Sequence, residues 1–326
     1  MELIILGSSA AIPVKNRNLS AIALRYRGET ILFDCGEDLQ RRFIEAGLKF
    51  NKPLQIFISH FHGDHIIGLP GLLFRFSLSE RTAPLTIFGQ RNLHAYLYFH
   101  NKILGLKANY PLTIYEIDHQ NQNLVEYKGL DAETPSNRIK IENSILFEKN
   151  RYIIRYTQVK HSVNTFAYSF EEKPRFGKFH PERARELGIP ESRLWKKLQS
   201  GKKLEYNGRI VDPLKEGIVD PQRPGRKITY SGDTMPCKSL IDLGMNSDVI
   251  IHESTFLDKL RDVAHEKQHS TSVDAAKDAK KMNAKILILT HISSRYQEDA
   301  EKLLEEAKEI FPNTEIAEDL KRFKIK

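Results

Sequence analysis

The chain has 326 residues, a length that suits one large α/β domain or two smaller ones. It carries 50 Lys or Arg and 42 Asp or Glu, and the net charge of +8 by itself only weakly favours an anionic partner. The two cysteines, Cys35 and Cys237, lack the paired spacing of a disulfide framework or a thiolate zinc site, which favours a reducing, cytoplasmic environment. Residues 1–7 have no basic leader, and their short apolar run predicts a first β-strand rather than a signal or a membrane span.

Short apolar strands alternate with turns along the first half of the chain. Ala21–Arg25 and Thr30–Phe33 flank Arg27-Gly28, a pattern typical of a β-hairpin. The run Leu54–Ser59 is rich in β-branched and aromatic side chains and predicts a buried strand that leads directly into His60. The other elements expected here are a strand at Leu3–Leu6, helices at Ile66–Phe76 and Asn92–Leu104, and strands at Leu112–Ile117, Tyr152–Gln158 and Phe166–Phe170.

Two stretches interrupt this pattern. Asp118–Asn150 is polar and weakly periodic, and we expect a surface excursion of hairpins there. Residues 171–225 cluster Pro, Gly and basic residues, and we expect an inserted flexible arm with a short helix at Pro181–Leu187. Residues 1–170 and 226–326 then form one core, which resumes with strands at Lys227–Tyr230, Val249–His252 and Ile286–Thr290 and helices at Lys238–Leu243, Ser272–Met282 and Gln297–Ile310. Strands and helices alternating in both halves predict a sandwich of two sheets with helices outside.

The most specific feature is the segment Ser-His-Phe-His-Gly-Asp-His, which follows the predicted buried strand. Side chains two residues apart in an extended chain point the same way, so His60 and His62 can hold one metal ion. Gly63 permits a tight turn that brings Asp64 and His65 toward a second ion. Imidazole and carboxylate ligands suit zinc. A chance cluster of hydrogen-bonded polar residues is the alternative, but four ligand-type residues at this spacing are highly specific.

Four protein ligands near one turn cannot fill the coordination shells of two ions, so further ligands are expected at other strand ends. Three positions qualify, each shortly after a predicted strand: His161, Asp233 and His291. Taken singly, a His or Asp at a strand end is more often structural than a ligand. Here the incomplete site requires partners and three strand ends each supply one, which favours metal binding.

At this point the chain resembles a known family. A H-x-H-x-D-H loop followed by a later His, Asp and His is the pattern of the metallo-β-lactamase superfamily. The resemblance narrows to the short form of tRNase Z (ribonuclease Z) through four further segments. These are Pro13–Asn18 (similar to P-x-K-x-R-N), His252–Thr255 (H-E-A-T), His269–Thr271 (H-S-T) and His291–Tyr296 (H-I-S-x-R-Y).

The resemblance implies an α/β fold, the four-layer αββα sandwich of the metallo-β-lactamases with an inserted flexible arm, and two Zn²⁺ per chain at the sheet edges. The implied ligand sets are His60, His62 and His161 for one ion, Asp64, His65 and His291 for the other, and Asp233 bridging both. Two ions about 3.5–4 Å apart can lower the pKa of a bound water toward about 7. Asp64 is implied as the general base, and His269, supported by Glu253, as the proton donor to the departing 3′-oxygen.

His269 has a second interpretation. Ser270, Thr271 and Ser272 look like N-cap residues, so His269 could equally be a hydrogen-bonding residue at the start of a helix.

The resemblance also implies where RNA binds. Residues 171–225 correspond to the family's protruding arm, which clamps the tRNA elbow, and Lys173–Arg209 holds eleven Lys or Arg against four Glu. A charge run is often only a solvated face, but phosphate binding is the better interpretation in an arm. Trp195 is expected to pack inside the arm. The expected tRNA contacts are Lys15, Arg17 and Asn18 near the acceptor end, whose alternative is an ordinary surface turn, and Lys178, Lys196, Lys197, Lys202 and Lys203 in the arm.

The leading hypothesis is a zinc-dependent endoribonuclease that removes the 3′ trailer from precursor tRNA by attack of a metal-activated water. The products would be a tRNA with a 3′-hydroxyl and a trailer with a 5′-phosphate. A homodimer in the cytoplasm, without a membrane partner, is expected by the same resemblance. Two alternatives stay open: a hydrolase of small esters, thioesters or cyclic phosphodiesters, which needs no basic arm, and a non-catalytic RNA-binding module, which needs no complete ligand set.

Overall fold

The computed structural model describes residues 1–325, which form two compact units. Unit 1 comprises Met1–Glu148, Ile154–Phe170 and the described residues from Lys227 onward. Unit 2 comprises Lys149–Ile153 and Glu171–Arg226. Within the described residues, no helix has the length and apolar character that crossing a membrane requires.

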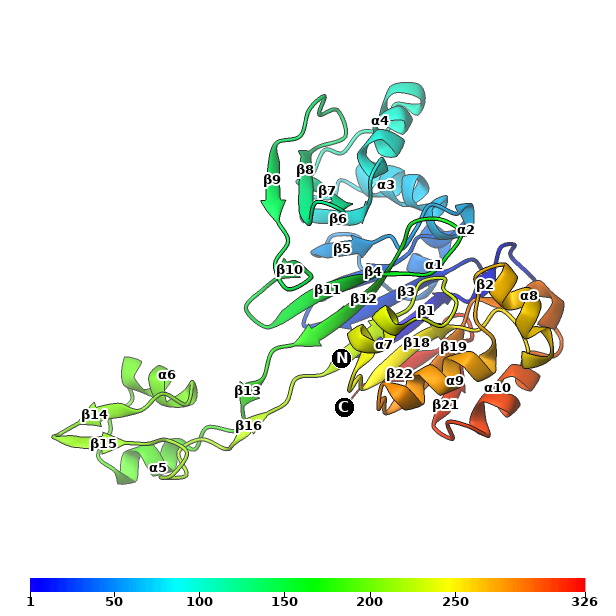
Figure 1. Ribbon diagram of the computed structural model, residues 1–326. Helices are drawn as coiled ribbons and strands as arrows, with labels where there is room; N and C mark the ends of the chain where they lie inside the picture. Colours follow the sequence, from blue (N-terminus) through cyan, green and yellow to red (C-terminus); the bar gives the residue numbers. More distant parts are fainter. Residues whose placement is uncertain (326) are drawn as a thin grey trace. The chain divides into compact units, whose positions relative to one another are not determined.

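The first sheet of unit 1 has nine strands in the order β22-β1-β3-β4-β5-β6-β7-β8-β9 (Figure 1). These are β1 (Glu2–Gly7), β3 (Ala21–Tyr26), β4 (Glu29–Phe33), β5 (Leu54–Phe57), β6 (Leu85–Gln90), β7 (Leu112–Asp118), β8 (Asn123–Lys128), β9 (Asn137–Lys140) and β22 (Arg322–Lys324). The predicted hairpin is confirmed, because β3 and β4 pair antiparallel across Arg27-Gly28. Strands β4 to β7 pair in parallel, so their carboxyl ends meet at one edge of the sheet.

Helices cover one face of this sheet. They are α1 (Leu39–Glu45), α3 (Gly68–Leu78) and α4 (Leu93–Leu104). The pleat of β5 decides what each side chain meets, because successive side chains point to opposite faces. Leu54 and Ile56 pack into the core shared with these helices, whereas Phe57 contacts Tyr168 of the second sheet at 5.4 Å between ring centroids. Burial on both faces explains why the strand reads as a continuous apolar run.

The second sheet of unit 1 has seven strands in the order β10-β11-β12-β17-β18-β19-β21. These are β10 (Ile145–Glu148), β11 (Tyr152–Val159), β12 (Thr165–Glu172), β17 (Lys227–Tyr230), β18 (Val249–Glu253), β19 (Ile286–Thr290) and β21 (Thr314–Ile316). Its apolar residues share a core with α7 (Lys238–Gly244), α9 (Ser272–Lys281) and α10 (Glu301–Lys308). Strands β17, β18, β19 and β21 are parallel, so a second set of carboxyl ends gathers at one edge.

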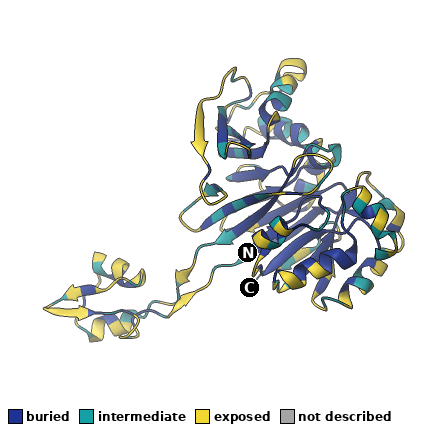
Figure 2. Cartoon of the chain, in the orientation of Figure 1, coloured by how far each residue is buried: buried dark blue, intermediate teal, exposed yellow. Residues whose placement is uncertain are grey.

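Aromatic rings join the two sheets face to face. The Phe33 ring lies 6.2 Å from that of Tyr168 and 5.6 Å from that of Tyr230, and the Tyr168 hydroxyl donates a hydrogen bond of 2.6 Å to the Ile58 carbonyl. Burying each such ring contributes about 1.5–3 kcal/mol. Figure 2 shows most strands of both sheets as buried, whereas the edge strand β9 is exposed. The predicted αββα sandwich is therefore confirmed.

Short elements complete unit 1. They are β2 (Ser9–Ala10), which pairs in parallel with β20 (Ile292–Ser293), the helices α2 (Gly63–Ile66) and α8 (Arg261–Glu266), and the 3₁₀ turns Asp258–Leu260 and Ser294–Tyr296.

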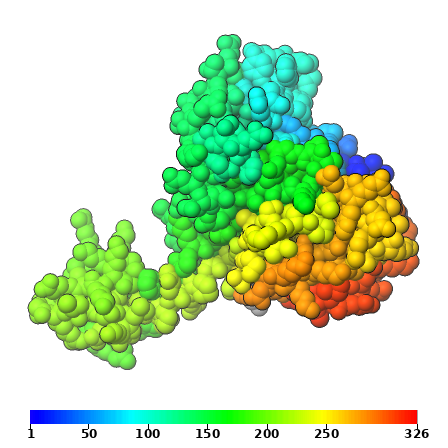
Figure 3. All heavy atoms as spheres, viewed as in Figure 1, coloured from blue at the N-terminus to red at the C-terminus, as the bar shows by residue number. Residues whose placement is uncertain are grey.

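Unit 2 has a small core of its own. Its elements are α5 (Pro181–Glu186), α6 (Arg193–Gln199), the pair β13 (Arg175–Phe176) and β16 (Gln222–Arg223), and the pair β14 (Leu204–Tyr206) and β15 (Arg209–Val211). Trp195 is buried there and its indole N–H donates to the Ile189 carbonyl at 3.2 Å, as predicted. Ser192 caps α6 through its side chain, although the helix itself was not predicted. Figure 3 shows the atoms around residues 180–220, in light green, packed on one another.

Three expected elements differ in detail. The helix expected at Ile66–Phe76 is split in two, and at the break the Gly68 amide donates to the Cys35 carbonyl at 2.9 Å while the His65 carbonyl accepts from the Cys35 amide at 2.7 Å. The hairpins expected at Asp118–Asn150 are present, because β7, β8 and β9 pair antiparallel in succession, but they extend the first sheet and bury Leu124 and Val125 rather than forming only a surface excursion. The last helix starts at Glu301 rather than near Gln297, after a 3₁₀ turn.

Candidate metal centre

Strand ends from both sheets deliver the predicted ligands to one place. The loop after β5 carries His60 and His62, and α2, which begins at Gly63, carries Asp64 and His65. The turn at Gly63 is thus the first turn of a helix and not a left-handed turn. From the second sheet come His161 after β11, Asp233 after β17 and His291 after β19. Gly232 has a φ of 59°, a conformation that favours glycine, and this places Asp233 at the end of its strand.

The seven side chains fall into two groups of converging donor atoms. The groups are His60, His62, His161 and Asp233, and Asp64, His65 and His291. Within each group the donor atoms lie within 4.8 Å of one another. Asp233 lies between the groups: its Oδ2 is 3.6 Å from His60 Nε2, 4.0 Å from His161 Nε2, and 3.3 Å from both His65 Nε2 and His291 Nε2.

Hydrogen bonds at the far side of the rings determine which nitrogen of two histidines carries the proton. His65 Nδ1 lies 2.7 Å from Asp34 Oδ2, and His161 Nδ1 lies 3.0 Å from the Gln268 carbonyl. Both partners can only accept, so each Nδ1 donates its proton, and each Nε2 is the nitrogen that faces the centre.

Hydroxyl groups hold two further rings in the same way. Ser59 donates to Asp34 at 2.7 Å and therefore accepts from His60 Nδ1 at 2.9 Å. Thr255 donates to Glu253 at 2.7 Å and therefore accepts from His291 Nδ1 at 2.9 Å. Four Nε2 atoms thus point into the centre.

These ring nitrogens lie close to one another. His65 Nε2 and His291 Nε2 are 3.3 Å apart, and His161 Nε2 is 3.2 Å from His62 Nδ1. Among the buried polar atoms of the described residues, His60 Nε2 and Asp233 Oδ1 have no hydrogen-bond partner. Nitrogen and carboxylate donors that converge in this way suit divalent cations, zinc among them.

Burial and neighbouring charges shift the pKa values of these groups in opposite directions. Burial and the nearby His65 hold the pKa of His60 well below its ordinary value. Burial also disfavours a charge on His65, but the carboxylates of Asp233 and Asp34 outweigh it and raise its pKa well above the ordinary value. Despite its burial, Asp233 has a strongly lowered pKa because His291 and His65 face it. A bound cation would take the place of the proton on His65.

His269 lies beside the centre and is held by an acid. Its Nδ1 is 2.8 Å from Glu253 Oε1, and its ring is 5.4 Å from that of His291. Burial works against protonation, but the Glu253 carboxylate raises the pKa of His269 to about 9. The helix-start function belongs to Thr271, whose side chain caps α9 together with Asp274. His269 therefore presents a protonated ring edge toward Asp233 and His291, with which it forms a third group of converging donors.

Two residues that hold the ligands were not predicted from the sequence. Asp34 is fully buried and accepts hydrogen bonds from Ser59, His65 and Tyr230. Thr255 connects His291 to Glu253. Asp34 directly follows a predicted strand, as Asp233 does, so its position at a strand end was the available signal.

Two of the three residues expected near the acceptor end are engaged within the fold. Arg17 donates to Ser8 and to the Ala317 carbonyl. Asn18 is buried. Lys15, in contrast, is exposed at the tip of the same loop.

The five expected arm lysines are all exposed: Lys178, Lys196, Lys197, Lys202 and Lys203. Lys203 pairs with Asp212 at 3.3 Å, whereas the other four ammonium groups form no ion pair with the described part of the chain.

Comparison with solved structures places this architecture in a class. The chain superimposes on human tRNase Z, short form, with a TM-score of 0.67 and 26% identity, covering 100% of both chains. It also shares its fold with the metallo-β-lactamase fold protein YhfI from Bacillus subtilis, at a TM-score of 0.64, 17% identity and 99% coverage of both chains. Residues 1–170 match the family described as "Anti-Pycsar protein Apyc1". The fold and the site together define a metal-binding hydrolase of the metallo-β-lactamase class.

Relatives that extend over the whole chain narrow this class. Ribonuclease Z of Nitrosopumilus maritimus is 40% identical over 326 residues, which is all of both chains. Ribonuclease Z of Methanosarcina mazei is 35% identical, covering 100% of this chain and 98% of the relative. The chain therefore belongs to the ribonuclease Z family.

Proposed function

We propose that this chain is a tRNA 3′-processing endoribonuclease that removes the trailer from precursor tRNA with two zinc ions at the centre around Asp233. The observation that carries the proposal is the convergence of four imidazole Nε2 atoms on that carboxylate, in a chain of the ribonuclease Z family. His60, His62 and His161 would hold one ion, Asp64, His65 and His291 the other, and Asp233 would bridge them. When bound, such a pair supplies Lewis acidity for activating water and neutralising phosphate charge.

The chain's own groups supply the proton transfers. Asp64 accepts a hydrogen bond from the Ala11 amide at 2.8 Å, which fixes its carboxylate beside the centre, and we assign it the proton of the attacking water. His269 holds a proton through Glu253 and donates it to the departing 3′-oxygen. Acid and base of this kind each contribute about 10²–10⁴-fold.

RNA binding is assigned to exposed cations. Lys15 would meet the acceptor end, and Lys178, Lys196, Lys197, Lys202 and Lys203 would meet tRNA phosphates through unit 2. Arg17 and Asn18 would support the Lys15 loop from inside. We also propose a homodimer, which light scattering during gel filtration would detect as twice the chain mass, and a cytoplasmic location, which suits the two cysteines without disulfides.

The decisive experiment is incubation with a 3′-extended precursor tRNA, with the product ends mapped. A single cut at the trailer junction, a 3′-hydroxyl on the tRNA and loss of cleavage in chelator are expected, with metal analysis approaching two zinc ions per chain. Cleavage that persists after complete metal removal would overturn the proposed centre.

Asp64→Ala tests the assignment of the base. We expect cleavage to fall by at least about 10²–10⁴-fold. The affinity for tRNA should stay largely unchanged, because the phosphate contacts are elsewhere. Measuring cleavage and tRNA binding on the same preparation separates the two effects, and retained cleavage would remove Asp64 from its role.

A further inference from the structure

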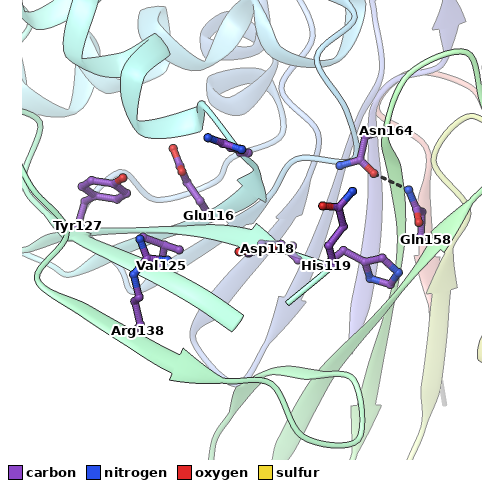
Figure 4. A pocket seen from close by; sticks show the side chains of 11 residues that line it. Glu116, Asp118, His119, Val125, Tyr127, Arg138, Gln158 and Asn164 are labelled. Atoms are coloured by element: carbon purple, nitrogen blue, oxygen red, sulfur yellow. Dashed lines mark hydrogen bonds between the residues drawn. The ribbon is translucent and has the colours of Figure 1, made fainter. Parts of the chain in front are cut away.

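Unit 1 has a second recess, where β6, β7, β8 and β9 lie side by side (Figure 4). Its volume of about 590 Å³ is in the range of ligand sites. Arg91 lines it directly after β6, His119 directly after β7, Tyr127 from β8 and Arg138 from β9. None of these side chains takes part in the cleavage chemistry proposed for the metal centre.

A glutamine connects this recess to the metal centre. In the amide orientation that satisfies both of its groups, Gln90 donates to the Asn164 carbonyl at 2.6 Å and accepts from the Phe61 amide at 2.9 Å. Phe61 lies between the two ligands of the first loop, and Asn164 lies three residues after His161. Arg91 and Asn164, which both line the recess, are thus joined through Gln90 to the two loops that carry His60, His62 and His161.

The cations of the recess form no close ion pair in the described chain, although the charges of Arg91 and Arg138 act on Asp118 and that of Arg91 on Glu116. Within the described residues, neither Arg91 nor Arg138 pairs with a carboxylate inside 4.0 Å, and both are exposed. Glu116 accepts the His94 amide of α4 at 3.0 Å, and Asp118 accepts from Asn121 at 2.9 Å. Two such guanidinium groups beside satisfied carboxylates favour a phosphate-bearing ligand.

Aromatic rings accompany these cations. The Tyr127 ring is stacked on His94 at 4.0 Å and 5° between planes, which fixes its orientation. His119 lies edge to face with Tyr156 at 5.7 Å. Burial lowers the pKa of His119, so it offers a neutral ring rather than a third cation. Proteins usually bind single-stranded RNA with arginine side chains, which pair with its phosphates, and with aromatic rings, which stack on its bases.

The Lys15 loop and the recess lie on different sides of the metal centre, which indicates which part of the precursor RNA each of them binds. The Lys15 loop joins the centre on the Asp64 side, through the Ala11 amide, whereas the recess adjoins the loop of His161. We propose that this recess binds the 3′ trailer of the precursor, with Arg91 and Arg138 pairing with its phosphates and His119 and Tyr127 flanking a base. This assignment rests on the proposed nuclease function, and it makes the recess a subsite for the leaving strand.

The test is a single-turnover titration of the whole enzyme on two precursors, one with a single-nucleotide trailer and one with a trailer of several nucleotides. For the combined variant Arg91→Ala and Arg138→Ala, we expect the half-saturating enzyme concentration to rise about tenfold or more on the long trailer. It should stay near the wild-type value on the single nucleotide. The slope of log affinity against log salt on the long trailer should fall by about 0.7 for each arginine–phosphate pair that the substitutions remove.

Lys128→Ala is the matched control, since it removes one positive charge from β8 next to Tyr127 without touching the recess. It should leave both substrates unaffected. The trailer assignment would be overturned if the double variant lost affinity equally on both trailers, or if it bound the long trailer as well as the wild type does. Cleavage of the precursor by the wild type would still support the nuclease function in either case. Inhibition by free nucleoside monophosphate in the wild type, without any dependence on trailer length, would instead make the recess a mononucleotide site and also overturn it.

Discussion

At the scale of single residues, the metal centre depends on the groups behind the ligands as much as on the ligands. Asp34, Ser59, Thr255 and the Gln268 carbonyl each accept a hydrogen bond from a histidine Nδ1. A ring held in this way presents a basic Nε2 at a fixed angle, which lowers the cost of organising the site around a cation. His291 itself has a φ of 56°, an uncommon conformation that the surrounding hydrogen bonds must hold.

Thr255→Val tests this support. Valine fills the same space but cannot accept from His291 Nδ1, so the ring loses its orientation and its tautomer is no longer determined. We expect metal affinity and cleavage each to fall by about 10–100-fold, measured by competition with a chelating indicator and by kcat/KM.

Thr255→Ser is the control for this substitution, because serine keeps the hydroxyl and should retain most of both properties. Equal behaviour of the valine and serine variants would show that the hydroxyl does not position His291.

At the scale of elements, strand ends place the site and helix starts hold it in position. The short segment between α8 and α9 contains both His269 and the helix cap Thr271, so the proposed proton donor lies directly before the capped start of a regular helix. Asp274 accepts from the Thr271 amide at 3.2 Å and from His265 Nε2 at 2.8 Å, and Thr271 accepts from the Asp274 amide at 3.1 Å. Such a capping box contributes about 1 kcal/mol.

Asp274→Asn tests whether the contribution of this cap to the stability of the protein depends on pH. Burial alone would raise the pKa of Asp274, but the hydrogen bonds from His265 and Thr271 lower it below the ordinary value. A lowered pKa in the folded state means that the stabilisation is complete above the unfolded value of about 3.9 and is lost as pH falls through the folded value. We expect the variant to unfold about 1 kcal/mol more easily at neutral pH and the difference from wild type to close below about pH 4. Urea unfolding of both proteins in chelator measures it, and a difference that is independent of pH would contradict the ionised cap.

At the scale of the whole molecule, unit 2 is a separate body with a basic surface. The two ends of its longer segment, Glu171–Arg226, run side by side, because the Glu172 amide donates to the Arg226 carbonyl at 2.8 Å. A short turn can therefore replace the residues between them without pulling β12 and β17 apart. The division also separates the metal centre from the basic surface, since the seven expected metal ligands all belong to unit 1.

Deleting the residues between Glu172 and Arg226 should separate binding from chemistry. We expect tRNA binding to weaken strongly while a small phosphodiester is still hydrolysed. The log–log salt slope of the remaining tRNA binding should fall by about 0.7–0.9 for each phosphate that the deleted lysines and arginines would have neutralised. Filter binding over a range of salt measures the slope. A slope that stays unchanged would place the phosphate-binding cations on unit 1. The small-substrate alternative would be favoured if the main activity were on a small ester or cyclic phosphodiester and stayed intact after the deletion.

Much of this architecture was accessible from the sequence. The hairpin at Arg27-Gly28, the buried strand before His60 and the parallel strands of the second half follow from apolar runs and turn residues, which act locally. The elements that were missed or displaced had non-local causes. At the break before Gly68 the backbone bonds to Cys35 instead of continuing the helix, and the hairpins of β8 and β9 become part of the core because they add to the edge of the first sheet.

The same distinction between local and non-local causes applies to the metal centre. Residue types and spacing were sufficient to select the seven candidate ligands and the ribonuclease Z resemblance, because metal chemistry restricts which side chains can serve and strand ends are visible as the limits of apolar runs. Only the tertiary structure decided that Asp34 and Thr255 hold the rings, that Arg17 and Asn18 point into the fold, and that Arg91 and Arg138 share a recess. Those relations join residues far apart in the chain, and the free energy that selects them comes from packing and burial, which no local pattern contains.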